Sequence, residues 1–228
     1  MANLARFQRP LRCTSTSALL GDNANVLTHI YDASINLVAW RRSLADEVAD
    51  YAQFLASADS TWSSLQCRLE PEAAYQALAR ELPEVPGKMA GKAALIRDAA
   101  ELVDMFCCLF DLPAAGLRLA LVNSAMCPKF HTDKVPCRLV TSYMGPGSEW
   151  LYNHQVERSR MGHRTGSKAD RDAGVYHDDA AVQQLAQHDV VLLKGESWLG
   201  NEGNGAVHRS PTPAAGSSRL LLTLDFSD

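Results

Sequence analysis

Two histidines and one aspartate form the most chemically suggestive pattern in the sequence. His131 and Asp133 stand two residues apart in the segment KFHTDKV, and His208 stands in the segment AVHRSP. On a strand, residues i and i+2 point to the same side with Cα atoms about 6.6 Å apart, so this imidazole and carboxylate can bind one ion. If the fold brings His208 to them, the three side chains form a two-histidine, one-carboxylate metal site. Such a site leaves several coordination positions open, which suits non-haem Fe(II).

Arg219 follows His208 with ten residues between them and opens the last β-rich segment of the chain. An arginine on the inward side of a barrel needs an anionic partner, because an unpaired buried charge is costly. A carboxylate cosubstrate would meet that need by a two-pronged contact, with Asp225 or a surface acid as the alternative partner. Arg209 is a second candidate for the anion anchor. It adjoins His208 and points the other way on an extended chain, so Arg219 is preferred.

Two cysteines bracket the His-x-Asp motif and leave a thiolate zinc site open as an alternative. Cys127 precedes His131 and Cys137 follows Asp133, each with three residues between. In an extended segment each cysteine lies about 13 Å from its neighbouring ligand and cannot share the ion. The adjacent prolines could bend the chain and bring one thiolate back. Buried, inert thiols are the preferred interpretation.

The elements that must position these residues divide the chain into a helical part and a β-rich part. Apolar residues at helical spacing predict helices over 43–57, 70–82 and about 88–110. Short β-rich runs separated by turn residues predict strands at 117–123, 137–143, 189–195 and 218–226, and residues 35–40 could form another. The expected fold is α+β: an antiparallel double-stranded β-helix, a jelly-roll or cupin-like barrel, with the N-terminal helices packed on its outside.

The 228 residues are expected to form a single domain, 1–228. About 1–116 would be mainly helical, and about 117–228 would form the β-barrel core. Residues 153–180 are polar and rich in basic side chains, which predicts a mobile loop. Long loops in compact domains often serve binding, so this loop is either a lid over the barrel mouth or a plain surface loop.

The composition excludes several classes of protein. A formal net charge of −4 gives no general basic footprint for nucleic acid. No run of about 18 uncharged apolar residues is present, so no membrane span is expected. The N-terminus has no secretory h-region, and the six cysteines form no CxxC pair. A cytoplasmic protein with reduced thiols is therefore predicted.

Residues 117–228 resemble the double-stranded β-helix of the Fe(II)/2-oxoglutarate-dependent dioxygenases. The segments that carry this resemblance are HTD (131–133), GESWLGNEGNGAVHRSP (195–211) and SRLLLTLDF (218–226). DVVLLKG (189–195) is similar to the strand and turn that precede the distal histidine in that family. The resemblance implies that His131, Asp133 and His208 bind iron. It also implies that Arg219 holds the far carboxylate of 2-oxoglutarate, assisted by Tyr143 or Thr141.

The whole chain also resembles a bacterial family catalogued only as domain of unknown function 1826. The segments concerned are NLVAWRR, CPKFHTDKVPCRLVTSYMGPGSEWL and VHRSP. Membership of that family implies no activity. It does imply that the CxxxHxD stretch and GPGSEW belong to one site-bearing module.

Three classes of function follow from these patterns. The first is an oxygenase that uses Fe(II) and 2-oxoglutarate on a small-molecule or peptide substrate. The second is a zinc-binding or zinc-handling protein, or a metal hydrolase, on the same barrel. The third is a non-catalytic binding module in which the barrel is a scaffold. None of the three calls for a nucleic acid or a membrane as partner.

Overall fold

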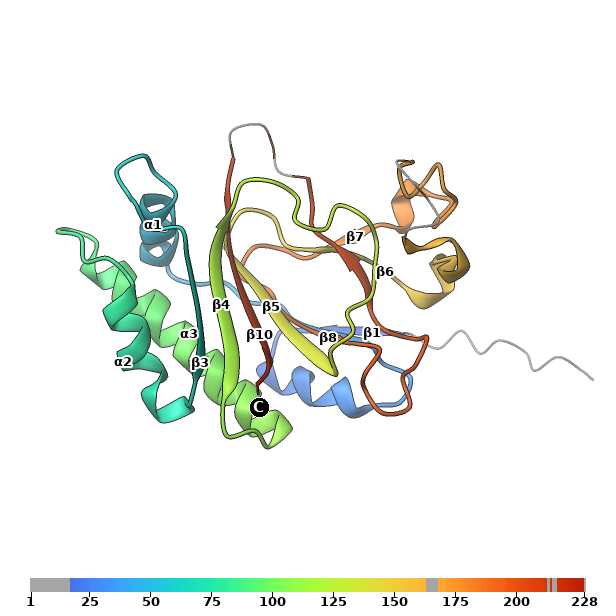
Figure 1. Ribbon diagram of the computed structural model, residues 1–228, viewed down its shortest axis with the longest axis horizontal. Helices are drawn as coiled ribbons and strands as arrows, with labels where there is room; N and C mark the ends of the chain where they lie inside the picture. The colour runs from blue at the N-terminus through green and yellow to red at the C-terminus, as the bar shows by residue number, and fades with distance from the viewer. Residues whose placement is uncertain (1–16, 163–167, 213, 215–216, 228) are drawn as a thin grey trace, which may run out of the picture.

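The computed structural model describes residues 17–162, 168–212, 214 and 217–227 of the chain. These described residues form ten strands in two sheets. Together with the helices they give an α+β fold (Figure 1). The strands of the large sheet are β1 (Ala18–Gly21), β2 (Leu37–Trp40), β3 (Ser64–Leu69), β4 (Ala115–Val122), β5 (Cys137–Met144), β8 (Val190–Lys194) and β10 (Arg219–Phe226). Their order is β1-β2-β8-β5-β10-β4-β3, and every neighbouring pair is antiparallel except β1 with β2. The strands of the small sheet are β6 (Glu149–Leu151), β7 (Gln183–Gln184) and β9 (Val207–Arg209), in the order β7-β6-β9.

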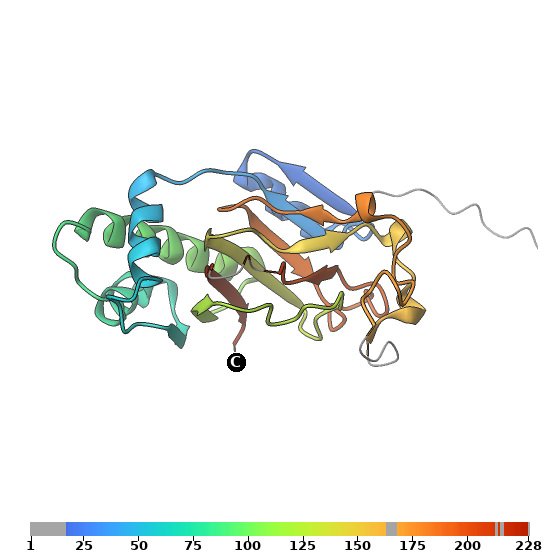
Figure 2. The ribbon, with the colours of Figure 1, turned by 90° about the horizontal axis from the view of Figure 1, so that it is seen from above.

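Helices cover one face of the large sheet, and the small sheet lies on the other side (Figures 1 and 2). The helices are α1 (Asp46–Leu55), α2 (Pro71–Glu81), α3 (Met89–Phe110) and the 3₁₀ helix η1 (Ala24–Tyr31). Pro71 opens α2, where its missing N–H leaves no helical hydrogen bond unmade. Among the described residues, no helix combines the length and apolar character needed to cross a membrane.

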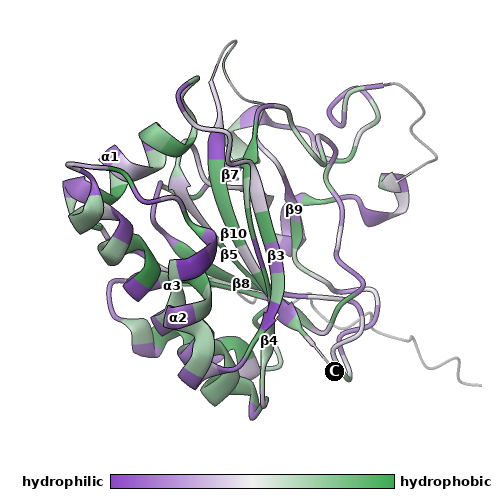
Figure 3. Ribbon diagram, turned by 60° about the vertical axis from the view of Figure 1, so that its left-hand side comes forward, coloured by the Kyte–Doolittle hydropathy of each residue, from purple (hydrophilic) through white to green (hydrophobic). Residues whose placement is uncertain are grey.

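Strict alternation along β10 explains how the central strand serves two apolar layers. Leu220, Leu222 and Leu224 belong to the core formed with the helices, whereas Leu221 belongs to the layer between the two sheets. The apolar colouring of the central strands in Figure 3 reflects this double burial. Each fully buried leucine contributes roughly 1.5–3 kcal/mol of transfer free energy. These leucines therefore hold β10 firmly in the core, and with it the polar residues of the strand.

The predicted elements and the observed ones agree in type along most of the chain. The three predicted helices correspond to α1, α2 and α3, and the five predicted strands correspond to β2, β4, β5, β8 and β10. The N-terminal part is less helical than expected, because β1, β2 and β3 all belong to the large sheet. Within the described residues the large and small sheets share no strand, so the structure shows two facing sheets rather than a closed barrel.

The polar segment 153–180, where a mobile loop is expected, contains several short helices in its described part. Residues 163–167 lie outside the described residues. The rest contains the 3₁₀ helices η2 (Asn153–Gln155) and η3 (Arg158–Arg160), and η5 (Asp179–Ala181) begins at its end. Val175 and Tyr176 are buried against Phe130 and the outward side of the small sheet. The described part of the segment therefore forms a third layer behind the small sheet.

A buried ion pair joins the helical layer to the large sheet. The Arg42 and Asp98 side chains are 8% and 9% exposed, and the guanidinium donates to both carboxylate oxygens of Asp98. The Tyr143 hydroxyl on β5 donates to the same carboxylate over 2.7 Å. Burial and the nearby Asp98 charge raise the pKa of Tyr143 well above its usual value, so the hydroxyl remains a donor. The network fixes α3 against β5.

Replacing Asp98 by alanine should lower the free energy of unfolding by about 3–5 kcal/mol, because it leaves the buried Arg42 charge without a partner. Asp104→Ala is the matched control, since Asp104 is an exposed residue of the same helix. It should change the free energy of unfolding by no more than about 0.5 kcal/mol. Chemical denaturation of both variants measures the difference, and equal small effects would show that the ion pair does not hold α3 to the sheet.

Candidate metal centre

A short antiparallel backbone pair brings the two histidines of the sequence pattern together. The His131 N–H donates to the His208 carbonyl oxygen, and the His208 N–H donates to the His131 carbonyl oxygen, both over 3.0 Å. Directly opposed residues of an antiparallel pair point their side chains to the same side. The two imidazole centroids are accordingly 4.6 Å apart. On its other edge β9 pairs with β6, where Trp150 stands opposite His208.

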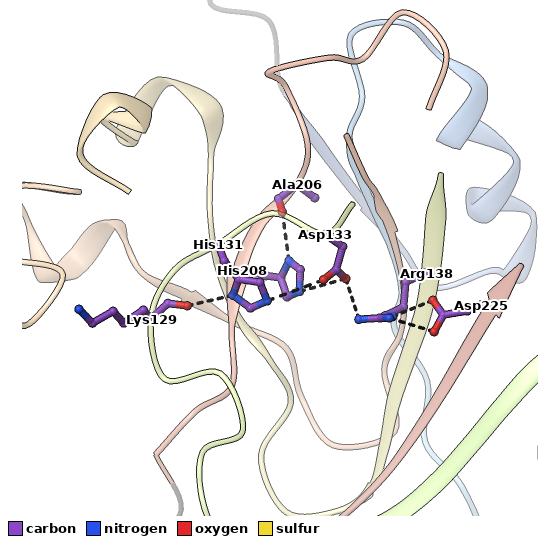
Figure 4. A network of polar contacts seen from close by, with 7 residues as sticks. All are labelled: Lys129, His131, Asp133, Arg138, Ala206, His208 and Asp225. Atoms are coloured by element: carbon purple, nitrogen blue, oxygen red, sulfur yellow. Dashed lines mark hydrogen bonds and ion pairs between the residues drawn. The ribbon is translucent and has the colours of Figure 1, made fainter. Parts of the chain in front are cut away.

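The Asp133 carboxylate completes a three-residue cluster with these imidazoles (Figure 4). Its Oδ1 lies 3.8 Å from His131 Nε2, and its Oδ2 lies 3.6 Å from His208 Nε2. All three potential ligand atoms lie within 4.8 Å of one another. Two ligands bonded to one ion at about 2.1 Å stand roughly 3.0–3.4 Å apart, so small side-chain movements would bring these atoms onto a shared divalent metal.

Backbone carbonyls orient both imidazoles for metal binding. His131 Nδ1 lies 2.9 Å from the Lys129 carbonyl oxygen, and His208 Nδ1 lies 3.0 Å from the Ala206 carbonyl oxygen. Because a carbonyl oxygen only accepts, each Nδ1 carries the proton. Each Nε2 then presents its lone pair toward Asp133 (Figure 4). A hydrogen bond at the far ring nitrogen is the usual way in which proteins fix a metal-binding histidine.

Burial keeps His208 in the neutral form that a metal requires. Its residue is 6% exposed, and this burial lowers the pKa of the imidazole to about 4, with Asp133 opposing part of the shift. At neutral pH the ring is therefore uncharged, and a metal does not have to displace a proton from it.

Arg138 on β5 holds the Asp133 carboxylate in place. Its Nη1 donates to Asp133 Oδ2 over 3.0 Å, while its Nε and Nη2 donate to the two Asp225 oxygens over 2.8 and 2.9 Å. The two-pronged contact with Asp225 on β10 fixes the guanidinium plane, as Figure 4 shows. The metal-facing carboxylate is thereby anchored to two central strands of the large sheet.

Arg219 lies on the inner face of β10 without an acidic partner among the described residues. It is 2% exposed; its Nη2 donates to Ser142 Oγ over 3.0 Å, and its Nε has no hydrogen-bond partner within that part of the chain. Burial alone lowers its pKa to about 10, so the group remains charged at neutral pH. Gly145 makes room for the side chain, because a Cβ there would lie 2.8 Å from Arg219 Cγ. The structure thus contains a buried guanidinium with an unused donor.

Arg209, the alternative anion anchor, is already neutralised on the other side of the small sheet. Its Nε donates to Glu149 Oε2 over 2.6 Å, and its Nη1 donates to Asp170 Oδ2 over 3.2 Å. Its guanidinium also lies 4.3 Å from the centre of the Phe130 ring. Asp225, the acid considered as a partner of Arg219, is paired with Arg138 instead.

The structure places Thr141 and Tyr143 away from the metal cluster. Tyr143 belongs to the core beneath the helices and bonds to Asp98, and the Thr141 hydroxyl lies 3.4 Å from the His188 carbonyl oxygen. Both residues alternate with Ser142, which faces Arg219. The expectation that either residue assists a cosubstrate is therefore not supported by this geometry; Ser142 occupies the inward position between them.

Neither bracketing cysteine belongs to the metal cluster in the described structure. Cys137 is fully buried in the core on the helical side of β5, and burial raises the pKa of its thiol far above the usual value. Cys127 is exposed and lines the cavity next to the histidines.

A cavity of about 970 Å³ opens beside the cluster and is lined by both histidines. Inward residues of the large sheet, including Val140, Leu221 and Thr223, form part of its wall. No described residue of 153–180 lines it, so the predicted lid stays a prediction. Arg138 and Ser142 were not singled out from the sequence, because neither belongs to a recognisable motif; only the strand pairing reveals what they face.

The sequence of this chain also matches a known protein family. A family model described as "Protein of unknown function (DUF1826)" matches residues 21–225. The chain belongs to the DUF1826 family. No curated protein matches this DUF1826 chain.

Solved structures similar to this DUF1826 chain include several oxygenases. The dioxygenase for auxin oxidation from rice is 15% identical, with 92% of this chain and 82% of that chain covered and a TM-score of 0.48. The dioxygenase for auxin oxidation 1 from Arabidopsis thaliana, in a complex with 2-oxoglutarate, is 10% identical, with 92% and 91% covered and a TM-score of 0.45. HygX from Streptomyces hygroscopicus with iron bound is 12% identical, with 89% and 85% covered and a TM-score of 0.45. These similarities are too weak to support a function, which is inferred instead from the cluster of His131, Asp133 and His208.

Replacing Arg138 by leucine should weaken divalent-metal binding about 10- to 100-fold, because Asp133 loses the donor that orients it. Calorimetric titration of metal-free protein with Zn²⁺ measures the change. Arg68→Leu is the control, since Arg68 lines the same cavity but bonds to Glu70 rather than to Asp133. Unchanged affinity in the Arg138 variant would mean that the carboxylate is held without this arginine.

Proposed function

We propose that this protein is a non-haem Fe(II)- and 2-oxoglutarate-dependent oxygenase built on a double-stranded β-helix. The observation that carries the proposal is the pairing of two features on one inner surface. The first is the His131, Asp133 and His208 cluster, and the second is the buried Arg219 whose Nε has no partner among the described residues. When bound, the iron would supply the chemistry by which molecular oxygen oxidises 2-oxoglutarate to succinate and carbon dioxide and transfers its second oxygen atom to a substrate C–H bond.

The donor set of the cluster fits Fe(II). Two imidazole nitrogens and one carboxylate occupy one face of an ion and leave the other positions free for a cosubstrate and oxygen. The thiols of Cys127 and Cys137 are outside the cluster, which removes the softer ligands that favour a closed zinc site. His131 and His208 would bind the ion through Nε2, and Asp133 would bind it while Arg138 holds the second carboxylate oxygen.

The surroundings of Arg219 fit the distal carboxylate of 2-oxoglutarate. A buried guanidinium without an acid is costly, and a carboxylate ligand would satisfy both its charge and its free N–H. Leu221 and Val140 line the cavity next to the histidines, and Arg219 and Ser142 occupy the next inward positions on the same two strands. In this proposal Ser142 orients the guanidinium, and Arg219 binds the cosubstrate at the end away from the metal.

Apolar residues between the two sheets would exclude water from the cosubstrate. The layer contains Trp150 opposite His208, together with Val191, Leu193 and Leu221. A dry surrounding strengthens the electrostatic attraction between Arg219 and a carboxylate. It also limits side reactions of the oxidising site with solvent.

Purified protein supplied with Fe²⁺, ascorbate and 2-oxoglutarate should convert 2-oxoglutarate to succinate and carbon dioxide, at a basal rate that a true substrate increases. His131→Ala and Asp133→Ala should each abolish succinate formation, because both remove a metal ligand. His177→Ala is the control, since His177 is exposed and outside the cluster. Succinate formation unchanged in both ligand variants would contradict the proposal, and tight Zn²⁺ binding without any effect of 2-oxoglutarate would favour a zinc protein.

Arg219→Gln should raise the KM for 2-oxoglutarate about 10- to 100-fold, because charge-assisted hydrogen bonds of this kind contribute about 1.5–3 kcal/mol. Metal affinity should remain within about twofold of the wild type, since Arg219 does not contact the cluster. An unchanged KM would show that another residue holds the distal carboxylate.

A further inference from the structure

The wall of the cavity beside the metal cluster carries an excess of positive charge. Three arginines line it, namely Arg68, Arg118 and Arg138, whereas Asp225 is its only acidic residue among those described. Asp225 is already bound by Arg138, and Arg68 is paired with Glu70 outside the cavity. Arg118 is the lining arginine for which no ion pair occurs in the described part of the chain.

Strand register places neutral hydrogen-bonding groups on both sides of Arg118. Gln66 on β3 and Thr223 on β10 both stand directly opposite Arg118 on β4. Neighbouring strands lie about 4.8 Å apart, so the three side chains form a polar row about 10 Å wide on one face of the sheet. All three line the cavity. A guanidinium flanked by an amide and a hydroxyl provides donors from three strands to one ligand group.

The contact that Arg118 makes does not neutralise its charge. Its Nη1 lies 3.5 Å from the Met126 sulfur, and a thioether is only a weak acceptor. The residue is half-buried, so part of its hydration is lost without replacement by an acid. An anionic ligand in the cavity would supply the missing partner.

The Arg118 position is separate from the Arg219 position. Arg219 stands opposite Val122, and Arg118 stands opposite Thr223, four residues further along β10. The two rows are thus about 13 Å apart along the strand. A cosubstrate bound at Arg219 would leave the Arg118 row free for a second molecule.

We propose that this cavity binds an acidic small molecule through an oxyanion, a carboxylate or a phosphate, held by Arg118 with Gln66 and Thr223. The idea that this molecule is the substrate of the oxygenase rests on the proposed function. The idea that it binds does not rest on the proposed function, because the row of Gln66, Arg118 and Thr223 contains none of the metal ligands. Gly116, the neighbouring cavity residue on β4, can accept a side chain, since a Cβ would meet only ordinary contacts at 3.6 and 3.7 Å.

The test is ligand-observed NMR with Zn²⁺-loaded protein, phenylacetate, hexanoate and phenyl phosphate, and the primary amides of the two carboxylates. At least one oxyanion should bind, and the matching amide should bind at least 10-fold more weakly. Arg118→Gln should weaken oxyanion binding about 10-fold, and Arg118→Lys should restore part of it because the charge returns. Arg97→Gln is the control, since Arg97 is exposed on α3 and does not line the cavity.

Gly116→Val provides a second, independent variant. It narrows the cavity beside Arg118 without changing charge, and it should also weaken oxyanion binding while the melting temperature stays close to that of the wild type. The proposal is overturned if none of the oxyanions binds, if amides bind as well as acids, or if Arg118→Gln has no effect. Loss of succinate formation with oxyanion binding intact would instead count against the proposed oxygenase alone.

Discussion

The candidate centre depends on two backbone hydrogen bonds between His131 and His208. These residues lie far apart in sequence, and neither sits in a long strand: His131 forms an isolated bridge, and His208 is the middle residue of a three-residue strand. The reciprocal 3.0 Å bonds set the imidazoles on the same side and bring Asp133 with them. The remaining cluster geometry follows from this pair, because the two local carbonyl contacts then fix which ring nitrogen faces inward.

Charge balance links this cluster to the rest of the inner surface. Asp133, Arg138 and Asp225 together carry one net negative charge, and Arg219 adds a buried positive charge elsewhere on β10. These four charges sum to zero, and a divalent ion and a dianion such as 2-oxoglutarate, added together, would keep the sum at zero. Either one alone would leave a buried excess, which is costly in a low-dielectric interior. The arrangement of charges therefore agrees with a site that takes up a metal and a dicarboxylate together.

The local pattern of the sequence was sufficient to predict the α+β class, the three helices and the grouping of His131, Asp133 and His208. Alternation along 218–226 also predicted which side of the last strand carries Arg219, and the structure has Leu220 and Leu221 in opposite apolar layers as that alternation requires. The local sequence pattern cannot predict which strands pair with each other. The role of Arg138 depends on its register with Asp225, and β3 has a half-polar sequence whose strand character comes from pairing with β4.

The positions of Thr141 and Tyr143 have a physical explanation of the same kind. The resemblance to the dioxygenases implied that Tyr143 or Thr141 assists the binding of the cosubstrate. A strand presents alternate residues to opposite faces, and sequence alone did not show which face of 137–143 is inward. In the structure Tyr143 lies on the helical side, where its hydroxyl bonds to the Asp98 carboxylate that is paired with Arg42. Ser142, the residue before Tyr143, therefore lies on the opposite, inward face.

The most direct measurement is an anaerobic titration of metal-free protein with Fe²⁺ and then 2-oxoglutarate, followed by visible absorption. A weak band should form only after both additions, should be absent in His208→Ala, and should need a higher 2-oxoglutarate concentration in Arg219→Gln. If iron binds to the cluster and no such band forms at any 2-oxoglutarate concentration, the cosubstrate does not chelate the metal. The claim that cluster and Arg219 together form an oxygenase site would then be wrong.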